Sequence, residues 1–147
     1  MSIVKIFGIV VLVAIVVIAA GAVMLSLKSK SGAALGLVDG VLAPCPSTPN
    51  CVSSEAGTPP SHLIDPLGVA TWENIPTMLE QSGGKITSQN ETYIAAEFTT
   101  SLMRFVDDVE FRKSDTAVHV RSASRVGKSD LGANAQRVEQ FRAALQQ

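Results

Sequence analysis

The sequence contains one run of twenty-two residues without a charge, from Ile6 to Leu27. As an α-helix this run would be about 33 Å long, close to the roughly 30 Å of a bilayer's hydrocarbon core. A single helix suits an isolated run in lipid, because the backbone there must satisfy its own hydrogen bonds. Lys5, Lys28 and Lys30 flank it. We therefore predict a short flank at 1–5 and a single transmembrane helix at 6–27 that binds the lipid bilayer.

A cleaved signal peptide is the alternative interpretation of the same run. Lys5 would then form its positive region, and Ala20-Gly21-Ala22 resembles the small-residue pattern of a cleavage site. The apolar segment of a signal peptide usually has about 7 to 15 residues. Because this run is longer, the pattern favours a retained anchor.

Lysines and cysteines give opposite indications about which side of the membrane holds the rest of the chain. Lys5 nearly balances Lys28 and Lys30, with a slight preference for a cytoplasmic domain. Cys45 and Cys51, the only two cysteines, enclose a short loop, and such a pair on an exported domain is typical of a disulfide. A metal-binding or redox pair is the alternative, although those sites favour closer cysteines. We expect an inner-membrane protein with its domain on the exported, periplasmic side.

Charge and length describe the part of the chain that follows. The first thirty residues hold three lysines and no acids, so the other 117 residues carry 9 of the 12 basic residues and all 13 acidic ones. A net charge of about −4 disfavours non-specific binding of this part to nucleic acid or to an anionic membrane surface. Residues 28–42 are rich in Ser, Gly and Ala and indicate a flexible spacer. Residues 43–147 suffice for one globular domain.

Proline content predicts how this domain begins. Residues 43–66 hold six of the seven prolines and both cysteines, which predicts a disulfide-closed strap without regular secondary structure. A helix then follows from an N-cap at Thr71 to Gly83-Gly84, and Pro76 should kink it or delay its start. Its apolar stripe is formed by Trp72, Ile75 and Leu79.

After the glycines the apolar period changes to two, which predicts four strands. These are residues 85–88, 92–99, 104–112 and 116–125, with Thr92, Ile94, Ala96 and Phe98 on one face of the second strand. A hairpin tip at Ser114-Asp115 pairs two sets of residues across the last two strands. The core-face pairs are Phe111 with Val118 and Val109 with Val120, and the opposite-face pairs are Glu110 with His119 and Asp108 with Arg121.

The final segment predicts a helix from Leu131 or Asn134 to Leu145, with Val138, Phe141 and Leu145 on one stripe. The complete order is helix, four strands, helix. We predict an α+β fold in which two helices pack on one face of a four-stranded antiparallel sheet, behind the transmembrane helix and the strap.

Several motifs in this order resemble the domain of unknown function 1499 family, and the resemblance covers nearly all of 43–145. The motifs are Cys45-Pro46-Ser47-Thr48-Pro49-Asn50-Cys51-Val52-Ser53-Ser54, Arg104-Phe105-Val106-Asp107-Asp108-Val109-Glu110-Phe111, His119-Val120-Arg121-Ser122-Ala123-Ser124-Arg125-Val126-Gly127 and Ser129-Asp130-Leu131-Gly132. The resemblance implies a small membrane-associated or exported protein of bacteria or plastids. It implies no activity and no catalytic residues.

The densest polar group lies on the last two predicted strands. Its members are Asp107, Asp108, Glu110, His119, Arg121 and Arg125. Carboxylates beside a histidine suit a divalent metal or acid–base chemistry, but alternation places Asp107 on the opposite face from Asp108 and Glu110. Asp107 is expected to face Ser122, and the cross-strand ion pairs explain the other charges. No metal ligand set and no cofactor are therefore predicted.

The loop from Ser124 to Gly132 is a second candidate site. Arg125 and Lys128 lie beside the start of the final helix, where backbone N–H groups suit a carboxylate or phosphate. The alternative is structural, with Asp130 capping the helix.

Three hypotheses about function follow. The first is a non-catalytic envelope module that binds an envelope protein or a small anionic ligand through the open sheet face or this loop. Its candidate ligand-binding residues are Arg121, Arg125, Lys128, Asp108 and His119. The second is a hydrolase or metal-dependent enzyme that uses Asp108, Glu110 and His119. The third is a thiol redox protein that uses Cys45 and Cys51.

Overall fold

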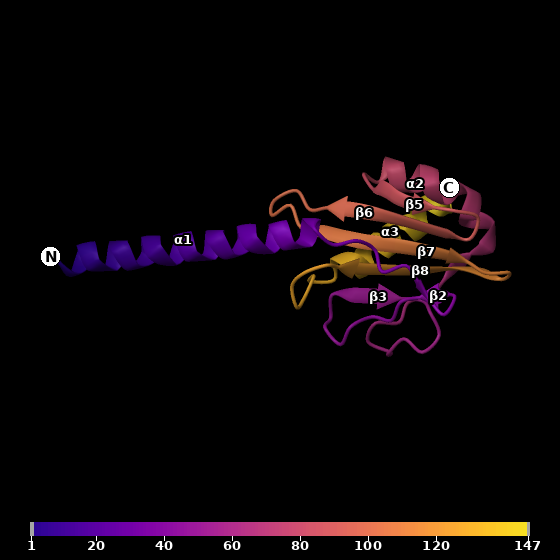
Figure 1. The fold of residues 1–147 in the computed structure, drawn as a ribbon, viewed down its shortest axis with the longest axis horizontal. Coiled ribbons are helices and arrows are strands. Elements are labelled where there is room, and N and C mark those ends of the chain that lie inside the picture. The colour runs from indigo at the N-terminus through magenta and orange to yellow at the C-terminus, as the bar shows by residue number, and fades with distance from the viewer. Residues whose placement is uncertain (1, 147) are drawn as a thin grey trace.

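The computed structural model describes residues 2–146, which form a long N-terminal helix followed by an α+β domain (Figure 1). Figure 1 labels most of the elements. Their bounds are α1 Ile3–Lys30, β1 Leu37–Val38, β2 Val41–Leu42, β3 Cys51–Ser53, β4 Leu67–Gly68, η1 Val69–Asn74, α2 Ile75–Gln81, β5 Lys85–Gln89, β6 Tyr93–Thr99, β7 Val106–Lys113, β8 Ala117–Ser124 and α3 Ala133–Leu145.

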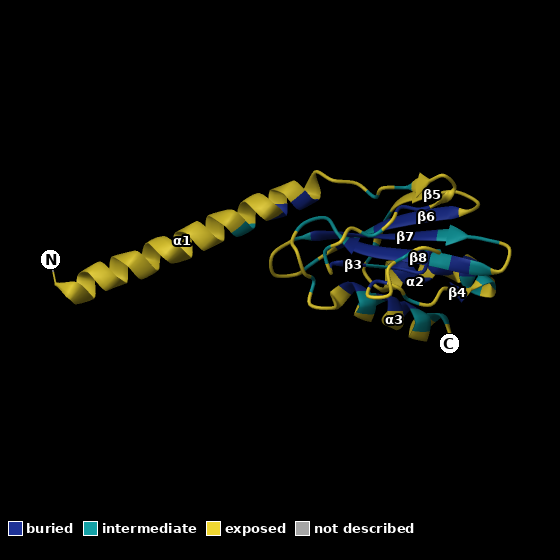
Figure 2. Cartoon of the chain, turned by 90° about the horizontal axis from the view of Figure 1, so that it is seen from below, coloured by how far each residue is buried: buried dark blue, intermediate teal, exposed yellow. Residues whose placement is uncertain are grey.

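Helix α1 contains the whole predicted segment 6–27 and is long and apolar enough to cross a bilayer. Most of its side chains are exposed, as Figure 2 shows. The exceptions lie near its C-terminal end, where Ser26 and Ser29 are buried against the domain. The Ser29 hydroxyl accepts a hydrogen bond from the backbone N–H of Val106 at 3.2 Å. The helix therefore ends in direct contact with the first residue of β7.

The sheet has six strands, two more than predicted, in the order β3-β8-β7-β6-β5 with β4 also paired to β8. All named pairs are antiparallel. The extra strands come from the proline-rich region and its end, so the expectation that 43–66 lacks regular structure is wrong. Residues 51–53 contain no proline and pair along the outer side of β8, and prolines are tolerated beside such an edge strand.

The alternation of faces on β7 and β8 is confirmed, but the predicted partners are wrong. Phe111 faces Val120 and Glu110 faces Arg121, two residues further along β8 than predicted. The cause is the hairpin tip, where Ser114 bonds to Ala117 and leaves residues 115 and 116 at the turn. A shift of two residues keeps every side chain on its face because the side-chain period of a strand is two.

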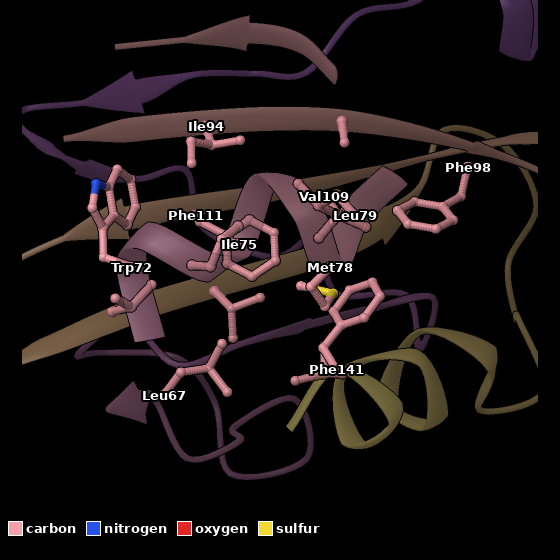
Figure 3. Close-up of a cluster of buried hydrophobic side chains, with 14 residues drawn as sticks. Leu67, Trp72, Ile75, Met78, Leu79, Ile94, Phe98, Val109, Phe111 and Phe141 are labelled. Carbon is pink, nitrogen blue, oxygen red and sulfur yellow. The ribbon is translucent and has the colours of Figure 1, made fainter. Parts of the chain in front are cut away.

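The hydrophobic core lies between the sheet and the two helices α2 and α3, as predicted. Figure 3 shows Phe141 of α3 directed toward the sheet, with its ring centroid 5.6 Å from that of Phe98 and 6.1 Å from that of Phe111. Trp72 is in this core. Pro76 delays the start of the α-helix, which is preceded by the 3-10 turn η1, and Thr71 bonds to the carbonyl of Gly68 instead of capping.

The second face of the sheet is covered, which differs from the open face and the flexible spacer expected from the sequence. The chain from Ser31 to Leu42 crosses this face and forms the β1–β2 hairpin. Leu42 is buried in a small cluster with Tyr93 and Ala95 of β6. The Gly36 amide also donates a hydrogen bond of 2.7 Å to Glu110 Oε1. The chain between α1 and the strap is therefore held against the sheet and is not a free spacer.

Cys45 and Cys51 form the predicted disulfide, with their Cα atoms 5.6 Å apart. Cys51 begins β3, so the bridge joins the preceding loop to the edge of the six-stranded sheet. Next to it, the His62 ring nitrogen Nδ1 lies 2.9 Å from the carbonyl oxygen of Cys51. These contacts hold the proline-rich segment on the domain.

Candidate functional site

The covered face of the sheet carries most of the charged residues that the sequence marks as candidates. Strand alternation directs these side chains away from the helices, beneath residues 31–55. The residues concerned are Glu97 on β6, Asp108, Glu110 and Arg112 on β7, His119 and Arg121 on β8, and Arg125 just after it. They form three groups along the face.

The group nearest α1 is centred on Arg125. Its guanidinium binds both oxygens of Asp108, at 2.7 Å from Nε and 2.6 Å from Nη2. Nη2 also binds Glu97, and Nη1 donates to the carbonyl oxygen of Ser29 at 3.0 Å. A guanidinium in contact with two carboxylates is stabilised in its charged form, and the hydrogen bonds that Arg125 donates to Asp108 raise the pKa of Arg125 above its usual value. Arg125 therefore joins the last turn of α1 to β6 and β7.

The central group surrounds Glu110, which is fully buried. Its carboxylate accepts hydrogen bonds from Arg121 Nη1 at 3.0 Å and from the Tyr93 hydroxyl and the Gly36 amide, each at 2.7 Å. Burial, followed by the hydrogen bond to Glu110, raises the pKa of Tyr93 well above 10, so Tyr93 remains a proton donor. This carboxylate connects two strands to the segment that covers them.

The third group lies at the far end of the face and is centred on Glu55. Arg112 binds both of its oxygens, at 2.6 and 2.9 Å, and the Leu42 amide donates to it at 3.1 Å. His119 Nδ1 lies 3.6 Å from Oε2 of the same carboxylate. Burial raises the pKa of Glu55, but the hydrogen bonds from Arg112 and Leu42 outweigh it and hold the pKa below 4.5.

This lowered pKa predicts a dependence of stability on pH. Because Glu55 has a lower pKa in the folded than in the unfolded chain, its contribution is present above the unfolded value and is lost as the pH falls through the folded value. The stability advantage of the wild type over Glu55→Gln should therefore shrink between about pH 5 and pH 3. Urea unfolding of the full chain in detergent micelles at each pH measures this. Glu139→Gln, at an exposed position, is the control and should differ from wild type by the same amount throughout.

Arg121 differs from the other two arginines of this face. Arg112 and Arg125 each bind a carboxylate with Nε and Nη2, the two nitrogens on one edge of the planar guanidinium. Arg121 is 4% exposed and uses Nη1 for Glu110, and its Nε is buried without a hydrogen-bond partner among residues 2–146. An unpaired buried donor on a charged group costs about 1 to 3 kcal/mol or more. Arg121 therefore has a donor that none of the described residues uses.

A cavity of about 250 Å³ adjoins Arg121. It lies between the sheet and residues 31–42, which we call the covering segment. Its lining consists of Gly32, Ala33, Leu35, Asp108, Arg121, Ala123, Ser124 and Arg125. Such a volume suits a small molecule of a few non-hydrogen atoms. An arginine with an unused donor in the wall of a small cavity is suited to binding a carboxylate, because the planar guanidinium matches carboxylate geometry.

The structure separates several residues that the sequence brings together. The predicted Asp108–Arg121 and Glu110–His119 pairs are replaced by Asp108–Arg125 and Glu110–Arg121. The sequence reasoning did not find Glu55, Glu97 and Tyr93 as members of the face. Glu97 and Tyr93 stand at alternate positions of β6, and that spacing is the signal that could have identified them.

Asp107 lies on the helix face, where it faces Ser124 instead of the predicted Ser122. Its carboxylate accepts a hydrogen bond of 2.7 Å from Arg137 Nη2 of α3. Arg137 also lies over the Phe98 ring, at 5.0 Å from its centroid. Asp107 therefore anchors α3 to the sheet.

The loop after β8 has the predicted structural arrangement at its end. Asp130 accepts hydrogen bonds from the backbone N–H groups of Gly132 and Asn134 and so caps α3. Gly127 and Gly132 have positive φ angles of 89° and 84°, which glycine adopts without strain. Lys128 is exposed on this loop, whereas the Arg125 guanidinium is engaged on the covered face.

The proposed enzyme residues Asp108, Glu110 and His119 have different partners. Asp108 binds Arg125, Glu110 binds Arg121, and His119 lies beside Glu55 and the Ser54 carbonyl oxygen. Within residues 2–146, no three His, Cys, Asp or Glu side chains are grouped closely enough to hold a metal ion.

Comparison with known proteins gives one match. The sequence model of a family described as "Protein of unknown function (DUF1499)" matches residues 41–145. No curated protein and no solved structure matches the chain.

Proposed function

The chain belongs to the DUF1499 family, and on the geometry of its covered face we propose that it is a membrane-anchored module that binds a small carboxylate at Arg121. The observation that carries this proposal is the buried Nε of Arg121, unpaired within residues 2–146, in a side chain that lines the 250 Å³ cavity. The proposed role of the module is binding, not catalysis.

Helix α1 supports the membrane part of the proposal. Its residues from Ile6 to Leu27 carry no charge, and their side chains are almost all exposed to the surroundings of the domain. Exposing so much apolar surface to water is unfavourable by roughly 25 cal/mol per Å², whereas lipid accepts it. The Cys45–Cys51 disulfide supports a domain on the exported side of the membrane, where disulfides persist.

The charges around the cavity favour a singly charged ligand. Arg121 is paired with Glu110 and Arg125 with Asp108, so these four charges sum to zero. The remaining charge is that of Glu97, which also contacts Arg125 and whose side chain is 26% exposed and therefore partly screened by water. A monoanion gains the contact with Arg121 at the cost of one screened repulsion. A dianion such as hydrogenphosphate, HPO₄²⁻, doubles that repulsion.

A ligand-dependent shift in thermal stability tests the proposal. The full chain in detergent micelles is heated in the presence of acetate, benzoate or inorganic phosphate. Acetate or benzoate should raise the unfolding temperature of the wild type, since a ligand that binds the folded chain stabilises it. Phosphate should raise it less. Native mass spectrometry of the chain purified from its own membrane should show an additional mass.

Three variants separate binding from folding. Arg121→Lys keeps the charge but removes the bidentate edge, and should abolish the shift. Ala33→Leu fills the cavity from the covering segment, without changing any charge, and should also abolish it. Arg142→Lys, on α3 and outside the lining of this cavity, should retain it. Equal shifts in the wild type and in both site variants would contradict the proposal.

A further inference from the structure

Three apolar side chains stand out on loops at the end of the domain that carries α1. Leu102 in the β6–β7 loop is 87% exposed, Met103 beside it is 40% exposed, and Leu131 in the loop after β8 is 97% exposed. Figure 1 shows both loops beside the C-terminal end of α1, extending toward its N-terminal half. They therefore reach back along the helix instead of covering the core.

A groove of about 420 Å³ between α1 and the β6–β7 loop shows how far along the helix this first loop reaches. Leu102, Met103 and Arg104 line one side of the groove, and the other side is lined by Ala19, Ala22, Val23, Ser26, Leu27 and Lys30. Ala19 precedes Leu27, the end of the uncharged run, by eight residues, or about 12 Å of helix. The loop tip thus lies beside the part of α1 that would occupy one leaflet.

The second loop meets a different face of α1. Leu131 and Val126 of this loop line a cavity of about 250 Å³ together with Phe105 of the first loop and Leu25 of α1. At 100° per residue, Leu25 points well away from the face formed by Ala19, Ala22 and Val23. The two loops therefore lie beside two faces of the helix at a similar height.

The backbone of these loops is also unusual. Leu131 and Arg104 have φ angles of 55° and 57°, in the left-handed region that disfavours residues with a side chain. For Leu131 this conformation leaves the apolar side chain almost fully exposed at the mouth of that cavity. Neither the backbone conformation of Leu131 nor its exposed side chain therefore adds to the stability of the domain.

The charges at this end of the domain are mainly positive. Lys28, Lys30, Arg104 and Lys128 are all exposed, and the acid in the same loops, Asp130, is engaged as the cap of α3. The chain after residue 30 has in contrast an excess of acidic residues. Basic side chains next to apolar ones match the order of an anionic headgroup layer above hydrocarbon.

We infer that this end of the domain is seated in the bilayer, with Leu102, Met103 and Leu131 in the outer part of the hydrocarbon and the four basic side chains among anionic headgroups. The inference rests on the proposal that α1 spans the membrane. The occupant is lipid, because one partner helix would fill the groove on one face of α1, whereas a bilayer surrounds both faces. The domain then has a fixed orientation on the membrane, and its distal hairpin at Asp115 points away from it.

Fluorescence quenching of tryptophans at chosen positions tests this placement of the domain in the bilayer. The full chain is placed in nanodiscs of phosphatidylcholine and phosphatidylglycerol with or without bromine atoms on the acyl chains. Leu102→Trp and Leu131→Trp report on the loops, Val16→Trp on the middle of α1, and Asp115→Trp on the distal hairpin. The native Trp72 lies beside Lys113, at the end of β7 opposite to Val106, and the two ends of this strand are about 23 Å apart, so Trp72 provides the background.

Brominated lipid should quench the added emission of Leu102→Trp and Leu131→Trp by about half or more, and that of Asp115→Trp very little. Quenching of Val16→Trp without quenching of the loop variants would contradict the insertion of the loops into the bilayer, but it would agree with α1 as a transmembrane helix. Quenching of only one loop would overturn the contact on two faces. Absence of quenching at Val16→Trp as well would overturn the anchor itself.

Discussion

Replacing Glu110 with leucine is expected to lower the free energy of unfolding by about 3 to 5 kcal/mol. The carboxylate is fully buried and is the charged partner of Arg121. Its removal leaves a buried guanidinium without a counter-charge and leaves the Tyr93 hydroxyl and the Gly36 amide without their acceptor. A loss of this size is a large part of the 5 to 15 kcal/mol that stabilises a typical domain.

Urea unfolding of the full chain in detergent micelles measures the effect. The double variant Glu110→Leu, Arg121→Met removes both charges and should regain part of the loss, because an apolar pair can replace a buried ion pair. Glu139→Leu is the matched control on an exposed site and should change stability by less than about 0.5 kcal/mol. A single variant as stable as this control would mean that Glu110 does not hold the covered face together.

Arg125→Met is the second substitution with a large expected effect. It leaves Asp108, which is buried, without its bidentate partner, and should cost about 3 to 5 kcal/mol. It also removes the hydrogen bond to the Ser29 carbonyl, so the end of α1 should separate more readily from the domain. Hydrogen exchange should become faster at the Val106 amide, whose acceptor is the Ser29 hydroxyl.

The controls for Arg125 separate charge from geometry. Arg125→Lys keeps one positive charge but not the bidentate contact, so an intermediate loss is expected. Arg142→Met removes a half-buried arginine that bonds to the backbone of Asp65 and Pro66, far from Ser29 in sequence, and should leave exchange at Val106 unchanged. Normal exchange at Val106 in Arg125→Met would show that this arginine does not hold the helix.

The alternation of residues along β6, β7 and β8 made much of the fold predictable. Ile94, Ala96 and Phe98 and the apolar residues of β7 and β8 lie on the helix face as expected, because a strand with one apolar face can be recognised from period two alone. The same period cannot locate the turn. Registers that differ by two residues bury the same side chains, so pattern alone assigned Arg121 to Asp108 and not to Glu110.

The cover of the second face was not predictable by the same reasoning. Residues 28–42 have the composition of a flexible spacer, yet Leu42 packs against Tyr93 and the Gly36 amide binds Glu110. Those contacts join residues far apart in the sequence, and the local composition of a segment carries no information about such contacts. β3 was missed for a similar reason, since three residues without proline pair with β8 only once the sheet exists.

The buried charges of the candidate site also depend on distant segments. Glu55 lies in the proline-rich segment and Glu97 on a neighbouring strand, so each meets its arginine only in the folded chain. Charges on a strand face usually indicate contact with water. Here a covering segment buries them, and the unpaired edge of Arg121 follows from that arrangement.

The central claim is that α1, the covering segment and the sheet form one continuous structure, which positions both the Arg121 cavity and the membrane-facing loops. Hydrogen exchange of the full chain in nanodiscs tests it most directly at the amides of Gly36, Leu42 and Val106, which bond to Glu110, Glu55 and Ser29. We predict that all three exchange as slowly as amides in the middle of β7. Exchange of Gly36 and Leu42 at the rate of an unstructured linker would contradict the account.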